Sequence, residues 1–361
     1  GGGELRGGED LEVPPMFRRA AALSAALGAA AAAAWPAQAR TQAQAQAQGQ
    51  GQAQDGDGRG SLAVLIENDA FASGTDRNYS NGVQLTWRAG YSEAPGLLRA
   101  LGRQLGDLVD LDPQSFGASL GHVIYTPENI GLTRAPPDDR PYAAMVYAKA
   151  GFAAQTEDRM DTVELTLGLV GPSAQGEWIQ SNFHTLLGAR DPKGWDDQLG
   201  DEIAFALDLE RRWRVPLGPR DRALSADLIP TLGLTLGTLR TEASAGVALR
   251  LGAGLDNDFG PPRIRPSLAG GGLVRTRDGL RVYGFAGVYG RLVAHDLFLD
   301  GNTWRRSASV SREPAVGDIQ AGLAAQWGGL SMAFTQVVRT REFKGQRSDQ
   351  QFGALTLVRS W

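Results

Sequence analysis

Apolar and polar residues alternate with a period of two along most of the chain after residue 60. In residues 162–169, Thr-Val-Glu-Leu-Thr-Leu-Gly-Leu, every second position is apolar and the positions between them are polar or glycine. Residues 80–91 and 203–210 repeat this alternation. Because successive side chains of a strand point to opposite faces, the pattern predicts a chain built of strands, each with one apolar and one polar face.

Strand-like segments recur to the end of the chain and are separated by glycine-rich and polar turns. They number roughly a dozen, and the further ones are 62–67, 116–124, 142–153, 224–236, 243–254, 264–274, 281–293, 316–328, 330–341 and 352–361. A soluble β-sandwich also has alternating strands. Aromatic residues near strand ends favour an all-β transmembrane antiparallel β-barrel instead, and they include Trp87, Tyr91, Tyr147, Trp213 and the terminal Trp361.

One segment breaks the strand pattern. Between Glu177 and Gly188, Ile179, Phe183 and the leucines that follow recur at helical spacing. Gln180 and His184 are four residues apart and therefore share one face of this predicted short helix. After residue 60 no apolar run approaches the roughly 20 residues of a spanning helix, which excludes a helical membrane protein.

The first 60 residues differ in composition from the rest. Residues 16–39 begin Met-Phe-Arg-Arg, continue with an apolar run and end Pro-Ala-Gln-Ala, which predicts a signal peptide cleaved after Ala39. Residues 1–15 are expected to be upstream sequence from an early start. Residues 40–60, rich in Gln, Ala and Gly, predict a disordered linker. We therefore expect one folded domain, residues 61–361, exported to a bacterial outer membrane.

Charge and composition narrow the function. The net charge is −4 and the chain has no strongly basic stretch, so nucleic acid is excluded as a partner. The chain has no cysteine, which excludes disulfides, thiolate catalysis and cysteine-ligated metals.

Two polar motifs carry candidate chemistry, Glu67-Asn68-Asp69-Ala70-Phe71 and Gln180-Ser181-Asn182-Phe183-His184. If the apolar positions of 62–66 face lipid, Glu67 and Asp69 share the polar face. Ser80 then lies on the polar face of the next strand, with Gln84 and Thr86. Asp69 and Ser80 would approach each other across the hairpin, and their oxygen atoms suit Ca²⁺ better than zinc.

His184 is the candidate general base. Its ordinary pKa near 6.5 lets it accept a proton from water at neutral pH, with Gln180 or another side chain fixing the ring. A divalent cation at Asp69 and Ser80 would stabilise the oxyanion of an attacked ester. Taken singly, Asn68 and Asp69 also fit a turn, Ser80 a lumenal hydroxyl and His184 an ordinary helix histidine. The other two histidines lack such neighbours: His122 falls in a strand and His295 in an arginine-bearing loop segment.

Two further groups are candidates for binding or catalysis. The charged segment from Arg134 to Arg140 could hold a phosphate or could be solvated. A Ser-His-Asn hydrolase made of Ser181, Asn182 and His184 is disfavoured, because near neighbours on one helical turn seldom converge.

From residue 61 to the end, the chain resembles the outer-membrane lipid A 3′-O-deacylase family. The resemblance rests on the order of several motifs: Leu62-Ala63-Val64 to Asn68-Asp69, Tyr79-Ser80-Asn81-Gly82, Ile124-Tyr125-Thr126-Pro127, Asp139-Arg140-Pro141-Tyr142, Val170-Gly171-Pro172, Gln180 to His184 with Gly188-Ala189, and Trp195-Asp196-Asp197-Gln198.

The resemblance implies a barrel of about twelve strands with a site between its wall and a short helix near the extracellular face. It implies Ca²⁺-dependent removal of the 3′-linked acyloxyacyl group of lipid A, the membrane anchor of lipopolysaccharide. By motif, His184 activates water, Asp69 and Ser80 support the metal, and Asn68 completes the site. Ser80 stands where the family motif has threonine, and the hydroxyl is kept. Arg134 stands where a basic residue meets a lipid A phosphate, and its motif matches less cleanly.

Other functions remain open on the sequence. A non-catalytic outer-membrane barrel, either a small-solute channel or a lipopolysaccharide-binding protein, would not need Asp69, Ser80 and His184 to converge. The candidate substrate-binding residues are Arg134, Arg140 and Gln180. An outer-membrane phospholipase would not need Arg134 and Arg140 as a pair facing a glucosamine phosphate.

Overall fold

The computed structural model describes residues 60–71, 77–109, 111–187, 190–218, 224–260 and 277–361. The predicted leader, the predicted signal peptide, nearly all of the predicted linker and the predicted strand at 264–274 lie outside these residues. Among the described helices, none combines the length and apolar character needed to cross a bilayer.

Twelve long antiparallel strands of the described residues form a closed barrel. Each strand pairs with the next along the chain, and the β1–β13 and β6–β8 pairings complete the ring. The strands are β1 (Ser61–Asn68), β2 (Asn78–Gly90), β3 (Ser115–Thr126), β4 (Ala143–Gln155), β5 (Arg159–Val170), β6 (Glu202–Trp213), β8 (Ser225–Gly237), β9 (Arg240–Gly252), β10 (Arg277–Asp296), β11 (Ala315–Gly328), β12 (Leu330–Arg339) and β13 (Gln350–Ser360). The prediction of an all-β antiparallel barrel of about twelve strands is confirmed.

Short elements connect the long strands. A two-residue strand, β7 (Val215–Pro216), pairs with β8. The helices are α3 (Gly96–Val109), α4 (Gly176–Leu187) and α5 (Leu297–Asp300), and the 3₁₀ turns are η1 (Asp69–Phe71), η2 (Tyr91–Glu93), η3 (Pro172–Ala174), η4 (Trp195–Asp197) and η5 (Leu255–Asn257). The sequence predicted α4 but not α3 or α5. His295 lies in β10 rather than in a loop, because that strand continues to Asp296.

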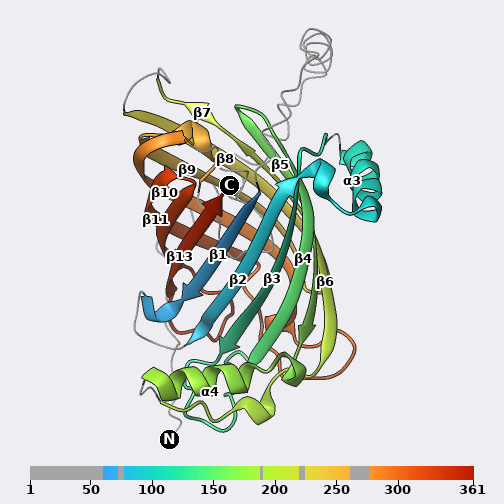
Figure 1. Cartoon of the computed structure of the whole chain (residues 1–361). Coiled ribbons are helices and arrows are strands. Elements are labelled where there is room, and N and C mark those ends of the chain that lie inside the picture. The colour runs from blue at the N-terminus through green and yellow to red at the C-terminus, as the bar shows by residue number, and fades with distance from the viewer. Residues whose placement is uncertain (1–59, 72–76, 110, 188–189, 219–223, 261–276) are drawn as a thin grey trace, which may run out of the picture.

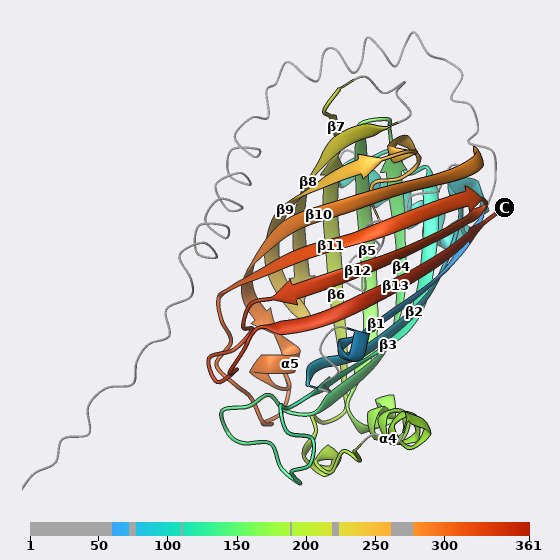
Figure 2. The ribbon, with the colours of Figure 1, turned by 90° about the vertical axis from the view of Figure 1, so that its left-hand side faces the viewer.

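The barrel has two different ends (Figures 1 and 2). One end holds residues 60 and 361 and is called the terminal end below. There the Trp361 N–H donates to the Gly60 carbonyl at 3.0 Å, which joins the last strand to the first. β1 runs from this end to the other, which carries η1, α4 and α5 and is called the α4 end below.

Side chains alternate between the outside and the lumen. Exposed apolar residues on the outside include Leu62, Val64, Val83, Leu85, Leu120 and Val146. Between them lie buried polar residues that face the lumen, among them Glu67, Gln84, Thr86, Ser119 and Lys149. An apolar exterior around a polar interior is the arrangement of a membrane barrel.

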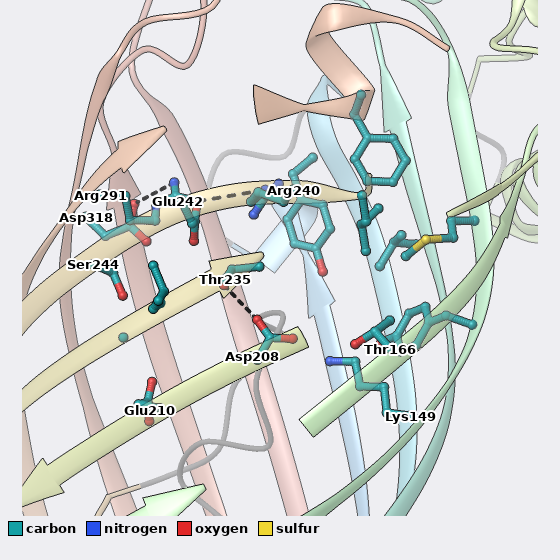
Figure 3. Close-up of a pocket in the computed structure, with 18 of the residues that line it drawn as sticks. Lys149, Thr166, Asp208, Glu210, Thr235, Arg240, Glu242, Ser244, Arg291 and Asp318 are labelled. Carbon is teal, nitrogen blue, oxygen red and sulfur yellow. Dashed lines mark hydrogen bonds and ion pairs between the residues drawn. The ribbon is translucent and has the colours of Figure 1, made fainter. Parts of the chain in front are cut away.

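The lumen is occupied at the α4 end. Phe298 of α5 packs on Tyr125, with 4.3 Å between ring centroids, inside a cluster of buried apolar residues. Four arginines lie near this cluster, three of them buried and Arg339 with 11% of its side chain exposed. They form ion pairs with carboxylates of neighbouring strands and loops: Arg140 with Glu342, Arg240 with Glu242 and Asp296, Arg291 with Glu242, Asp318 and Glu342, and Arg339 with Asp318 and Glu342. Figure 3 shows part of this network above a cavity in the lumen.

A second buried network occupies the lumen at the terminal end. Arg250 donates to Asp227 at 2.8 Å and to Asp258 at 2.6 Å, and the Tyr283 hydroxyl donates to Asp258 at 3.0 Å. Asp258 follows η5, so this turn is fixed against the barrel interior. The lumenal cavity of Figure 3 therefore has an ordered network of charged residues toward each end.

Candidate functional site

A β-bulge positions Ser80. β2 and β3 pair in continuous register from Gly90 to Asn81, and the register then shifts by one residue before Tyr79. Ser80 is the extra residue, and its Oγ lies 2.7 Å from Oγ1 of Thr126. Tyr79 lines the lumenal cavity. The prediction that Ser80 shares a face with Gln84 and Thr86 is wrong, because a bulge interrupts the alternation and re-aims the side chain.

Asn68 and Asp69 lie beside Ser80 at the end of β1. Asn68 pairs with Asn81 across the hairpin and, by alternation with Leu62, belongs to the outer face. Asp69 begins η1, so strand alternation does not decide its direction. It is buried, and its Oδ2 accepts a hydrogen bond from the Arg77 N–H at 2.8 Å. The first motif and the Ser80 segment are therefore held together at the α4 end.

Helix α4 packs over the outer face of the barrel wall. Ile124 of β3 and Ala144 of β4 alternate with the exposed Leu120 and Val146, which places them on the outside. Both are nevertheless buried, in a cluster that contains Tyr142, Ala174 and Trp195 and packs against Ile179 of α4. Figure 1 shows α4 lying across this end of the barrel.

The imidazole of His184 is oriented by a backbone carbonyl. His184 is buried, and its Nδ1 lies 2.5 Å from the carbonyl oxygen of Arg190. A carbonyl oxygen only accepts hydrogen bonds, so Nδ1 carries the proton of the neutral ring and Nε2 is the basic nitrogen. The sequence could not indicate this partner, because any residue at position 190 supplies the same carbonyl.

Gln180 anchors α4 to the loop that follows it. Its Oε1 accepts a hydrogen bond from Nε1 of Trp195 at 2.9 Å, and both side chains are buried. The Trp195 ring packs on Tyr142 with 4.9 Å between centroids. The ring of His184 is thus fixed by the Arg190 carbonyl, whereas the bond of Gln180 to Trp195 fixes the helix.

The two candidate phosphate-binding arginines lie in different environments. Arg134 is 79% exposed and its Nε lies 3.3 Å from Oδ2 of Asp197. Arg140 is 1% exposed, pairs with Glu342 at 3.4 Å and stacks on Tyr125 at 4.4 Å. The two arginines therefore do not form a pair facing one ligand. Arg140 belongs to the lumenal network instead.

Two contacts at the site had no clear signal in the sequence. Thr126 is the partner of the Ser80 hydroxyl. His122 lies two residues after Leu120 in β3 and therefore points to the same, outer face. Its Nε2 lies 2.8 Å from the carbonyl oxygen of Ala174, in the turn before α4. His122 was expected to be an ordinary strand histidine, and its contact instead helps to hold the start of α4 on the barrel wall.

The possible metal ligands near Asp69 are oxygen atoms. No group of three or more His, Cys, Asp or Glu side chains able to hold a metal occurs among the described residues. The donors present are one carboxylate, the paired hydroxyls of Ser80 and Thr126, and the buried Oδ1 of Asn78, which has no hydrogen-bond partner within the described part of the chain. Such an all-oxygen set fits Ca²⁺ and does not fit zinc.

Comparisons with known proteins identify relatives of the whole barrel. A family model described as "Outer membrane protein LpxR" matches residues 23–361. The solved structure of LpxR from Salmonella typhimurium is 18% identical with a TM-score of 0.66, and the alignment covers 83% of this chain and 99% of that chain. The beta domain of the Bordetella autotransporter Brka is 12% identical with a TM-score of 0.43, covering 84% and 100%. No curated protein matches the chain.

Proposed function

We propose, because the chain belongs to the LpxR family of outer-membrane proteins, that it is an esterase that hydrolyses the 3′-linked acyloxyacyl ester of lipid A. The observation that carries this proposal is His184, held by the Arg190 carbonyl so that Nε2 is its basic nitrogen, on a helix packed over the outside of the barrel. Lipid A lies in the bilayer around such a barrel, so a site on the outer wall is placed where this substrate is found.

The proposed chemistry begins with proton transfer. Nε2 of His184 takes a proton from a water molecule as that water attacks the ester carbonyl carbon. The Nδ1 hydrogen bond to the Arg190 carbonyl keeps the ring in place while Nε2 carries this proton. The same proton then passes to the leaving alkoxide, which returns His184 to its starting state.

Ca²⁺ is the proposed cofactor. Asp69 and Ser80 would hold it, with Asn68, Asn78 and Thr126 offering further oxygen atoms nearby. When bound, the ion supplies positive charge against the negative oxygen that develops on the ester carbonyl. Substrate binding is assigned to Arg134, which is exposed beside η4 and can meet a phosphate of lipid A. Gln180 supports the site through Trp195.

The lumen argues against a channel. α5 and the arginine–carboxylate network occupy the barrel at the α4 end, and the Arg250 network occupies it at the other. A solute would have to displace buried ion pairs, and breaking one such pair costs about 3–5 kcal/mol. A site on the outer wall needs no passage through the lumen.

The test is mass spectrometry of lipid A incubated in detergent with the purified protein. We expect loss of the 3′-acyloxyacyl group with Ca²⁺, no loss with a chelator, and at least about a hundredfold slower loss with His184→Ala. Asn182→Ala is the control on the same helix, because Asn182 is exposed and, within the described part of the chain, its side chain donates to the Trp178 carbonyl of the same helix. We expect its rate to match the wild type.

The same assay separates the alternatives. Cleavage of glycerophospholipid but not of lipid A would identify a phospholipase. Unchanged lipid A in every condition, from protein that is folded, would contradict the proposal and favour a lipopolysaccharide-binding barrel.

A further inference from the structure

Helix α3 lies on the outside of the barrel wall at the terminal end. It connects β2 to β3, and Leu98 packs against a cluster of Ala94, Phe116 and Phe152. Phe116 of β3 and Phe152 of β4 are directly paired, and Phe116 lies four residues before the exposed Leu120 in the same strand. Because side chains alternate along a strand, both rings point to the outer face. Figure 1 shows α3 projecting from the side of the barrel rather than covering its opening.

The helix is fixed to the wall. The Tyr91 hydroxyl donates to the Arg99 carbonyl at 2.6 Å, and Nη1 of Arg99 donates to the Ser92 carbonyl at 2.8 Å. A Cβ added at Gly102 would lie 2.9 Å from the Phe152 ring, so the helix backbone approaches that ring closely. Such contacts give α3 a defined orientation relative to the barrel.

Among the described side chains of α3, an apolar one and a basic one are exposed. Leu97 is 74% exposed, and Arg103 is also exposed. The helix sequence, Gly-Leu-Leu-Arg-Ala-Leu-Gly-Arg-Gln-Leu-Gly-Asp-Leu-Val, repeats leucine at intervals of three and four residues and carries two arginines four residues apart. This is the composition of helices that lie in a membrane interface.

The position of α3 along the barrel also matches an interface. Trp87 is exposed on the outer face, and its ring packs edge-on against Phe116 at 5.9 Å, beneath α3. Tryptophan and tyrosine gather where the apolar belt of a barrel meets lipid headgroups. The exposed Leu97 therefore lies beside the lipid-facing surface of the barrel, on the same helix as the exposed Arg103.

We propose that α3 is an interfacial helix that binds the phospholipid leaflet at the terminal end of the barrel. Leu97 enters the boundary of the acyl chains, and the guanidinium of Arg103 binds the phosphate of an anionic phospholipid. The occupant is lipid rather than a protein partner, because the surface is continuous with the barrel's lipid-facing belt and its charge complements phosphate. This inference does not depend on the proposed deacylase activity.

The depth of α3 can be measured directly because the chain has no cysteine. Single nitroxide labels at Leu97→Cys and Arg103→Cys would be compared in liposomes containing phosphatidylglycerol, using collisions with oxygen and with a water-soluble nickel complex. Leu120→Cys on the outer wall is the lipid reference, and Ser309→Cys in an exposed loop is the water reference.

We expect the label at 97 to collide with oxygen as the one at 120 does, and the label at 103 to be intermediate. If the label at 97 meets nickel as freely as the label at 309, the helix lies in water and the proposal fails. As a second arm, Arg103→Gln should weaken phosphatidylglycerol binding about fivefold in native mass spectrometry. Arg306→Gln, an exposed arginine at the other end, should leave it unchanged. Equal lipid retention by both variants would overturn the role of Arg103.

Discussion

Ser80 is the extra residue of a β-bulge, and this bulge sets the direction of its hydroxyl. The motif indicated a hydroxyl near Asp69, and the hydroxyl is there, bonded to Thr126. The hydroxyl does not point as period-two alternation predicts, because a one-residue bulge interrupts that alternation. The bulge follows Asn78, whose φ of 63° is left-handed, and asparagine tolerates that conformation better than most residues. An asparagine alone is too common to have indicated it.

The hydroxyl at position 80 can be tested apart from activity. We expect Ser80→Ala to lose a buried hydrogen bond and about 1 kcal/mol of the free energy of unfolding. It should also weaken Ca²⁺ binding, measured by calorimetric titration of the detergent-solubilised protein. Ser80→Thr restores the hydroxyl and should bind Ca²⁺ as the wild type does. Equal Ca²⁺ affinity in all three proteins would remove Ser80 from the metal site.

At the scale of elements, the helical spacing of Ile179 and Phe183 was sufficient to predict α4. It could not show which surface the helix covers. The covered surface includes Ile124 and Ala144. Both lie on the outer face of the barrel by alternation, and Trp195 and α4 bury them. α3 was not predicted, although its leucines repeat at helical spacing, because it is a single short helix between two strands with clear period-two alternation. The element missed at one end and the element found at the other both pack on the outer wall.

Two glycines that each begin a helix allow the docking of α4 to be tested. A Cβ added at Gly176 would lie 2.4 Å from Cβ of Ala144 and 2.5 Å from the Trp195 ring, whereas one added at Gly96 of α3 meets no atom within 4 Å. Gly176→Ala should therefore push α4 from the wall at a cost of about 1–3 kcal/mol and slow lipid A deacylation. Gly96→Ala should leave the rate unchanged.

Folding of the barrel in these two variants can be checked separately from their activity. Both proteins should keep the compact migration of a folded barrel in an unheated SDS gel, since neither glycine belongs to a strand. Full activity in Gly176→Ala would mean that close packing of α4 on β4 is not required for the reaction.

For the whole molecule, alternation and terminal aromatics were enough to predict a membrane barrel. The contents of its lumen were not predictable, because the partners are far apart in the chain: Arg140 pairs with Glu342, 202 residues away. Period-two alternation marks a position as inward-facing and polar, but not which opposite charge it meets. The lumenal ion pairs therefore emerge only when the ring closes.

Glu342 makes this network sensitive to acid. It lies 3.2 Å from Arg339, 3.4 Å from Arg140 and 3.7 Å from Arg291. Burial alone would raise the pKa of Glu342, but the surrounding arginines outweigh burial and hold that pKa below its usual value of 4.5. A carboxyl whose pKa is lowered by folding stabilises the folded state above its unfolded pKa. This contribution is lost as the pH falls from about 4.5 through the lower folded pKa.

We therefore expect Glu342→Gln to lower the free energy of unfolding by about 3–5 kcal/mol at pH 7, because it leaves buried arginines without one of their carboxylates. The difference from the wild type should shrink as the pH falls below 4.5, since acid neutralises Glu342 in the wild type as well. Urea unfolding in liposomes between pH 3 and pH 7 measures the loss of unfolding free energy at pH 7 and its decrease at lower pH. Glu93→Gln, at an exposed position in η2, is the control and should follow the wild type at every pH. A difference between Glu342→Gln and the wild type that stays constant down to pH 3 would mean that the side chain acts through packing rather than through its charge.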